Sequence, residues 1–299
     1  MRSNRPKKPV RRSRLARWAV APIGIAVAAI LAGCSQQQLQ GFLPGSPDTT
    51  NHTSQVMGLW VTSWIVLLGV GIVTWGLIIW AAIVYRRRKG QTGLPVQLRY
   101  NMPIEIFYTI VPLILVLGFF AFTARDQADI EANPGNPDVK IEVFGKRWSW
   151  DFNYLDSNVY SPGVQVSDRL NPDGSVDLSK LPTLYLPVGE KVQIDIESRD
   201  VAHSFWVIDF LYKKDMIPGQ TNHMYFIPEK EGTYQGKCAE LCGEYHADML
   251  FQVKVVSQAE YAAQMQKLKD AGQTGRLGPE YNTNTNLPGT ASPVPTSEG

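Results

Sequence analysis

The sequence has 299 residues, and its formal net charge of +2 at pH 7 hides an uneven distribution. Residues 1–33 carry eight basic residues and no acidic one, whereas the remaining chain has 21 basic and 27 acidic residues. An acidic folded part disfavours nucleic acid as a partner and favours a basic partner through long-range steering. The alternative is an ordinary soluble surface without such a partner. The chain has three cysteines, which are too few for a disulfide-rich scaffold.

The N-terminus has the layout of a bacterial export signal. Basic residues 1–17 precede an apolar stretch over 18–32, and Leu-Ala-Gly-Cys follows and ends at Cys34. The tetrapeptide resembles a lipobox, so we predict a lipoprotein signal peptide over 1–33 and lipidation of Cys34. The alternative is a short uncleaved membrane helix. Polar residues 34–57 are expected to form an extracytoplasmic tether.

Two apolar segments follow. Residues 59–85 contain no charge and would span about 40 Å as a helix. The second segment, 104–122, is interrupted only by Glu105 and Pro112. We predict a transmembrane hairpin over 58–125 in a bacterial cytoplasmic membrane, as a multi-pass protein in contact with lipid. The loop 86–103 has five basic residues and no acid, which places it in the cytoplasm and the C-terminal part outside. A buried hairpin of a soluble protein is the alternative.

Short strand patterns replace helical ones from residue 139 onward. Alternating or β-branched segments cover 140–144, 183–188, 191–196, 224–227 and 250–256. Many short strands predict a sandwich or barrel over 126–257. Residues 155–180 read as an inserted surface loop, and 258–299 as a C-terminal helix followed, from about Gly272, by a disordered tail.

Potential metal donors are concentrated in one short segment. Cys238, Cys242, His246 and Met249 lie within twelve residues, and each is a soft or borderline donor suited to copper. Of the other histidines, His203 is the best placed to supply a second imidazole. Two bridging thiolates, with one histidine and one further ligand per metal, can hold two coppers that share an electron. Such a pair suits an electron relay without an open position for substrate. A Cys238–Cys242 disulfide and a zinc site with both histidines are the alternatives.

The motif C-x-E-x-C-G-x-x-H-x-x-M and the paired spans resemble cytochrome c oxidase subunit II over roughly residues 55–257. The resemblance implies a membrane-anchored chain whose two transmembrane helices precede an all-β, Greek-key, cupredoxin-like barrel with a dinuclear copper centre, CuA. It implies that Cys238 and Cys242 bridge both coppers. The other implied ligands are His203, His246, Met249 and the carbonyl of Glu240, whose side chain would bind a Mg²⁺ shared with subunit I.

The resemblance extends beyond the metal loop. Residues 145–154 resemble the aromatic stretch that admits electrons, with Trp148 as the point of uptake, and Trp150 is predicted to be strand core. Residues 215–219 match an adjoining D-x-I-P-G loop. Glu105 falls where the family has a carboxylate at the mouth of a proton path, although an acid near a membrane interface also occurs without such a role. Arg147 stands where the family usually has Gln.

The implied function is that of a relay in a respiratory oxidase. Electrons would pass from a c-type cytochrome, soluble or tethered in a supercomplex, through CuA to haem in subunit I. There O₂ is reduced to water with proton translocation, and further oxidase subunits are expected partners. The alternatives are a copper chaperone or storage lipoprotein and a copper-free quinol oxidase subunit II. The chain has no C-x-x-C-H motif, so it carries no c-type haem of its own.

Overall fold

The computed structural model describes residues 35–94, 97 and 99–278. The predicted signal peptide, Cys34 and the tail beyond residue 278 lie outside the described residues. The chain divides into two units at Leu43 and Pro44. The described part of the first contains the short helix α2 (Gln36–Leu39), and the second contains all the other described elements.

Two long helices are apolar enough to cross a membrane, α3 (Thr53–Val84) and α4 (Met102–Glu131). Both exceed the apolar segments read from the sequence. The helix α3 begins at Thr53 rather than at residue 59, and α4 continues to Glu131 rather than ending near residue 122. Helical geometry persists in the polar extension of α4 because its end packs against the β domain, where Glu131 pairs with Lys214 and accepts a hydrogen bond from Tyr212.

The second half of the predicted tether belongs to the folded unit. Thr49, Thr50 and Thr53 are buried, and Thr50 forms a backbone bridge with Pro228. The backbone N–H of Ile227 donates to Asn51 Oδ1 at 2.7 Å. The polar side chains that suggested a free linker instead satisfy backbone groups of the domain.

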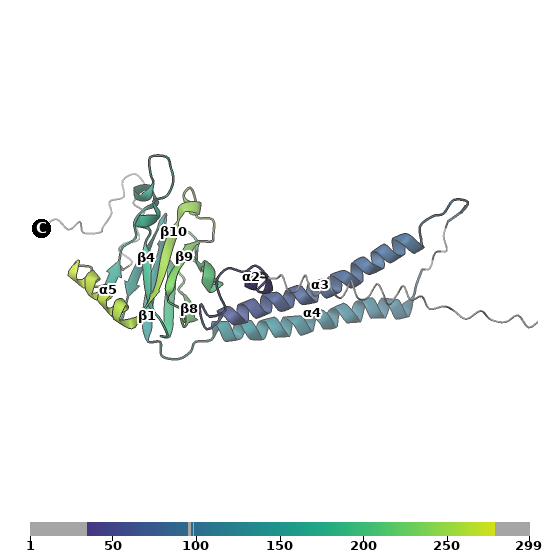
Figure 1. The fold of residues 1–299 in the computed structure, drawn as a ribbon, viewed down its shortest axis with the longest axis horizontal. Coiled ribbons are helices and arrows are strands. Elements are labelled where there is room, and N and C mark those ends of the chain that lie inside the picture. The colour runs from purple at the N-terminus through teal and green to yellow at the C-terminus, as the bar shows by residue number, and fades with distance from the viewer. Residues whose placement is uncertain (1–34, 95–96, 98, 279–299) are drawn as a thin grey trace, which may run out of the picture. The chain divides into compact units, whose positions relative to one another are not determined.

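Two five-stranded sheets pack around a common core (Figure 1). The first has the order β3-β2-β1-β5-β8 and the second β4-β10-β9-β6-β7. Two pairings are parallel, β1 with β5 and β4 with β10. The first sheet comprises β1 (Val139–Lys146), β2 (Ser149–Tyr154), β3 (Val159–Ser161), β5 (Val192–Ser198) and β8 (Asn222–Phe226). The second comprises β4 (Thr183–Pro187), β6 (His203–Val207), β7 (Tyr212–Met216), β9 (Gly232–Cys238) and β10 (Leu250–Val256).

Aromatic rings join the two sheets. Trp150 in β2 lies 5.7 Å from Phe205 in β6 and 5.0 Å from Phe251 in β10, between ring centroids. Its side chain is fully buried, as is that of Phe152. The predicted fold class of two apolar helices and a cupredoxin-like β domain is therefore confirmed, and Trp150 is a core residue as expected.

The insertion 155–180 is more ordered than a surface loop. It contributes β3 and two 3-10 helices, η1 (Val166–Arg169) and η2 (Leu178–Lys180). Val159 and Arg169 are fully buried. The polar composition did not reveal this strand because β3 joins the sheet edge through backbone hydrogen bonds. Such bonds form with almost any side chain.

The helix α5 (Gln258–Asp270) lies where a C-terminal helix was predicted and contacts β3 and β4. Residues 272–278 then run against the domain, so the expectation of a disordered tail from Gly272 is wrong for this part. Leu277 is only 1% exposed, and Arg276 pairs with Glu142. One apolar anchor and the backbone of a short segment suffice to hold it, which composition alone does not reveal.

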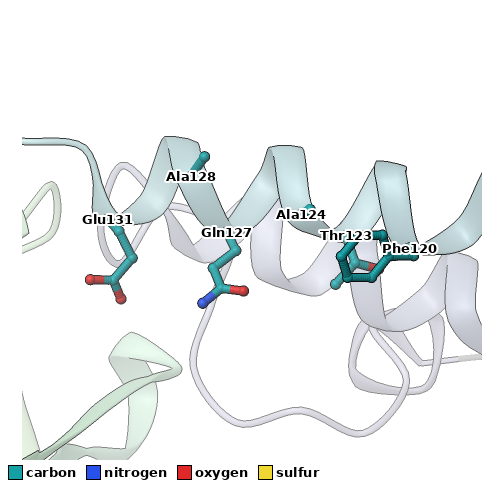
Figure 2. Close-up of a pocket in the computed structure, with 6 residues that line it drawn as sticks. All are labelled: Phe120, Thr123, Ala124, Gln127, Ala128 and Glu131. Atoms are coloured by element: carbon teal, nitrogen blue, oxygen red, sulfur yellow. The ribbon is translucent and has the colours of Figure 1, made fainter.

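A hollow on the C-terminal part of α4 is drawn in Figure 2. Its polar lining includes Gln127 and Glu131, and its remaining lining side chains are short or apolar: Phe120, Thr123, Ala124 and Ala128. None of these residues belongs to the predicted metal donors, so the functional site lies elsewhere in the chain.

Candidate metal centre

The sheet brings the predicted donors together. His203 opens β6 and Cys238 ends β9, and these strands are paired next to one another, with Phe205 opposite Cys238. The loop after β9 then carries Cys242, and His246 opens the short 3-10 helix η4 (His246–Asp248). Met249 follows η4 directly before β10.

The donors surround the two sulfur atoms. Cys238 Sγ lies 3.8 Å from Cys242 Sγ, 3.7 Å from His203 Nδ1 and 3.2 Å from the carbonyl oxygen of Glu240. On the other side, Cys242 Sγ lies 3.6 Å from His246 Nδ1 and 3.8 Å from Met249 Sδ. Both cysteines are free, so the alternative of a disulfide does not describe this structure.

These separations fit metal coordination. Two donors that bind one tetrahedral ion at about 2.0–2.3 Å lie about 3.5–3.8 Å apart. The thiol of Cys238, the thiol of Cys242 and the imidazole of His203 place ligand atoms within 4.8 Å of one another. Six donors are gathered here, whereas a structural zinc ion takes four. The four donors other than the thiols form two pairs, one next to Cys238 and one next to Cys242. This arrangement fits two metal ions that are both bridged by the two thiolates.

Most of the donors are buried. His203 and Met249 are fully buried, and both cysteines are buried as well. Gly145 lies against the His203 ring, where an added Cβ would come within 3.1 Å of a ring carbon, so a larger residue would displace the ligand. The indole N–H of Trp150 donates to the carbonyl of Met249 at 3.2 Å and thereby fixes the backbone at that ligand.

Asp200 is a functional residue that sequence reasoning missed. Its carboxylate oxygen Oδ1 lies 2.9 Å from Nε2 of His203, and its Oδ2 accepts the backbone N–H of Arg147 at 2.8 Å. Burial would lower the pKa of His203, but hydrogen bonds to Asp200 and Cys238 outweigh burial and raise it. An acid three residues before a ligating histidine is the sequence signal that could have found it.

The two thiols influence each other. Their mutual contact lowers the pKa of Cys238 and raises the pKa of Cys242, so the Cys238 thiol loses its proton more readily. Metal binding requires both thiolates and therefore displaces any remaining thiol proton.

Comparison with known proteins is consistent with this geometry. Residues 139–256 match the family described as "Cytochrome C oxidase subunit II, periplasmic domain". The chain is 40% identical to the probable cytochrome c oxidase subunit 2 of Streptomyces avermitilis, over 90% of this chain and 91% of that one. The chain belongs to the cytochrome c oxidase subunit 2 family. It is therefore one subunit of a haem–copper oxidase.

A further relative is the cytochrome c oxidase subunit 2 of Mycobacterium tuberculosis. It is 31% identical to this chain, over 82% of this chain and 80% of the relative. Among solved structures, the periplasmic domain of subunit II from Bradyrhizobium japonicum is 30% identical. The matched region covers 46% of this chain and 96% of the solved domain, with a TM-score of 0.40.

Trp148 lies over the loop that carries the donors. Its ring meets Tyr245 edge to face at 5.0 Å between centroids. Gly243, at φ +123°, has no side chain, and an added Cβ would come within 2.9 Å of the Trp148 ring. The residue expected to admit electrons into a subunit 2 chain is thus packed on the segment between Cys242 and His246.

Two other predicted residues lie outside the donor set. The Glu240 side chain is exposed while its carbonyl faces Cys238. Glu105 lies in the first turn of α4, where Oε1 accepts the backbone N–H of Asn101 at 2.8 Å. Glu105 therefore has a helix-capping contact in addition to the proton-path role expected for it in subunit 2.

Proposed function

We propose that the chain accepts single electrons from a c-type cytochrome at a dinuclear CuA centre and passes them to haem in subunit I. There O₂ is reduced to water, coupled to proton translocation. The gathering of four further donors around two thiols 3.8 Å apart carries this proposal. When bound, two coppers bridged by both sulfurs would share one electron, so that reduction alters each bond only slightly. The donors would be Cys238, Cys242, His203, His246, Met249 and the Glu240 carbonyl.

The chain keeps these donors in place. The backbone N–H of Cys238 and the indole of Trp150 both donate to the carbonyl of Met249, at 3.1 and 3.2 Å. Burial of His203 and Met249 excludes water. Fixed and desolvated ligands need little rearrangement when charge changes, which is what fast electron transfer requires.

Electron uptake is proposed at Trp148. Its packing against Tyr245 and Gly243 supplies a continuous path of contacts into the metal loop. Residues 124–257 carry 13 basic and 21 acidic residues, so the domain attracts a basic donor over long range.

The remaining assignments concern the surroundings. Two apolar helices and a family domain described as periplasmic support an extracytoplasmic position for the metal centre on a bacterial cytoplasmic membrane. The exposed Glu240 carboxylate would bind Mg²⁺ at the contact with subunit I. Cys34 would carry the lipid, which mass spectrometry of the mature chain tests by the loss of residues 1–33.

The test is metal analysis of the full chain, purified in detergent and loaded with copper. We expect two coppers per chain and an EPR signal of one electron shared by both ions. Cys242→Ser should abolish that signal because a single thiolate cannot bridge in this geometry, whereas His223→Ala, at an exposed imidazole, should preserve it. One copper per chain, or zinc in preference to copper, would refute the dinuclear centre.

A further inference from the structure

Arg169 is a buried charge that the proposed electron path does not use. It ends η1 inside the insertion 155–180, and its side chain is 0% exposed. Arginine is rarely buried without a paired acid, because removing its charge from water is costly. Its position therefore requires an explanation.

The guanidinium of Arg169 is incompletely compensated. Nη1 donates to the carbonyl of Leu250 at 3.3 Å, but Nε and Nη2 are buried with no hydrogen-bond partner among the described residues. No carboxylate oxygen among the described residues bonds to its Nε or Nη2, and the more distant charge of Asp248 partly offsets its burial. Arginine remains protonated at any physiological pH, so the charge is permanent.

Arg169 lies next to the metal loop. Leu250, whose carbonyl it contacts, directly follows the donor Met249, and Asp248 directly precedes it. The same short helix is also tied to Trp148, whose carbonyl accepts from the N–H of Val166 at 3.2 Å and whose N–H donates to Gln165 Oε1 at 2.9 Å. The insertion thus contacts both the turn that carries Trp148 and the backbone next to Met249, and it brings a cation to the latter.

We propose that Arg169 is a positioning residue that raises the reduction potential of the copper centre through its fixed positive charge. This inference rests on the proposed function. One electron leaves the c-type cytochrome, which is oxidised, and reduces the centre, which lowers its total charge by one. A nearby cation stabilises that reduced form relative to the oxidised one. Because the guanidinium is buried, dissolved ions screen the effect much less than they would at an exposed charge.

The expected size follows from simple electrostatics. A unit charge within about 10 Å, at an effective dielectric constant near 20, changes a one-electron equilibrium constant on the order of tenfold. Tenfold corresponds to about 59 mV for one electron. A shift of this size would alter the direction of electron flow from a donor of similar potential.

The test is a potentiometric titration of the full, copper-loaded chain, followed by its optical spectrum. Arg169→Gln should lower the midpoint potential by about 60 mV, as a tenfold change requires. Arg169→Lys should retain most of the unmodified value. Lys180→Gln, which removes an exposed cation from the same insertion, is the matched control and should leave the potential unchanged. Arg169→Met, an uncharged side chain suited to a buried site, replaces the glutamine variant if that one fails to fold.

Each outcome is decisive. An unchanged potential in Arg169→Gln, or an equal fall in the glutamine and lysine variants, would overturn the role of the charge. A shift that disappears at high salt would do the same, because dissolved ions screen a buried charge much less than an exposed one. The EPR signal of the unmodified chain distinguishes failure of the proposed dinuclear centre from failure of the proposed role of Arg169. A signal without a shared electron refutes the dinuclear centre. A shared-electron signal together with an unchanged potential in Arg169→Gln refutes only the role of Arg169.

Discussion

Asp200 and His203 are joined by a 2.9 Å contact between carboxylate Oδ1 and ring atom Nε2. The other ring nitrogen, Nδ1, lies 3.7 Å from Cys238 Sγ and faces the centre. Because Nε2 is engaged, the ring is held in one orientation with Nδ1 available to a metal, as outer carboxylates commonly arrange for histidine ligands. The same carboxylate binds the backbone N–H of Arg147, so one side chain anchors both a ligand and the residue next to Trp148.

Asp200→Asn should weaken copper binding without removing a donor. Loss of an outer partner of a ligating histidine costs about 10–100-fold in metal affinity. Competition with a copper chelator measures this in the full chain. The matched control is Asp195→Asn, which alters a similar 2.7 Å contact to His223, outside the donor set. Equal affinities for the Asp200→Asn variant and the unmodified chain would contradict the positioning role.

Copper affinity should depend on pH through His203. Its folded-state pKa is raised above the ordinary 6.5, so in the metal-free chain the protonated ring contributes stability below pH 6.5. This stability is lost as pH rises through the raised value. A metal needs the neutral ring, so copper affinity should increase over the same window above pH 6.5. Chelator competition should measure copper affinity between about pH 6 and 8.5, a range that includes the ordinary pKa of histidine. A copper affinity that does not change with pH in this range would argue against proton competition at His203.

Trp148 and Trp150 should respond differently to truncation. Trp148→Ala removes a ring packed on Tyr245 and Gly243, so donor oxidation should slow severely while the copper spectrum stays unchanged. Trp150→Ala empties a fully buried position between Phe205 and Phe251 and should cost about 3–5 kcal/mol of stability. Stopped-flow oxidation of a reduced c-type cytochrome and thermal unfolding separate the two. Normal turnover in Trp148→Ala with intact copper would place electron uptake elsewhere.

Features carried by side-chain chemistry were predictable from the sequence. The spacing of Cys238, Cys242, His246 and Met249 indicated a metal loop, because four soft donors rarely occur so close together without a metal. His203 had to be inferred from its type, since only the pairing of β6 with β9 brings it to the loop. Strands such as β1 and β10 were visible as alternating apolar residues, and the paired helices as long uncharged stretches.

Features carried by backbone contacts were not predictable. Residues 272–278 and β3 are held by main-chain hydrogen bonds and by single anchors such as Leu277, which leave little trace in composition. No sequence pattern singled out Asp200 or Arg169. Their roles depend on distances to His203 and Leu250, which only the folded chain sets.

The outer face of β1 and β2 is buried although it is polar, and residues 272–278 help to cover it. Asn153 exchanges hydrogen bonds with the backbone of Leu277, at 3.0 and 3.1 Å. Arg199 donates to the carbonyls of Leu277 and Gly278 at 2.9 and 2.7 Å and pairs with the buried Asp151. These contacts contribute hydrogen bonds to buried polar groups of the domain, and Arg199 directly precedes Asp200.

Deleting residues 272–299 should therefore destabilise the domain and weaken copper binding together. Removal breaks the hydrogen bonds that Arg199 and Asn153 make to residues 277 and 278, although Arg199 keeps its pair with Asp151. Each buried group that loses such a bond costs about 1–3 kcal/mol. Each kcal/mol lowers the melting temperature by about 2–4 °C in a chain of this size class. Deletion of 279–299 alone keeps Leu277 and is the control for shortening the chain. Because Arg199 precedes Asp200, the longer deletion should also reduce copper affinity in the chelator assay. If both deletions melt and bind copper alike, residues 272–278 do not support the metal centre.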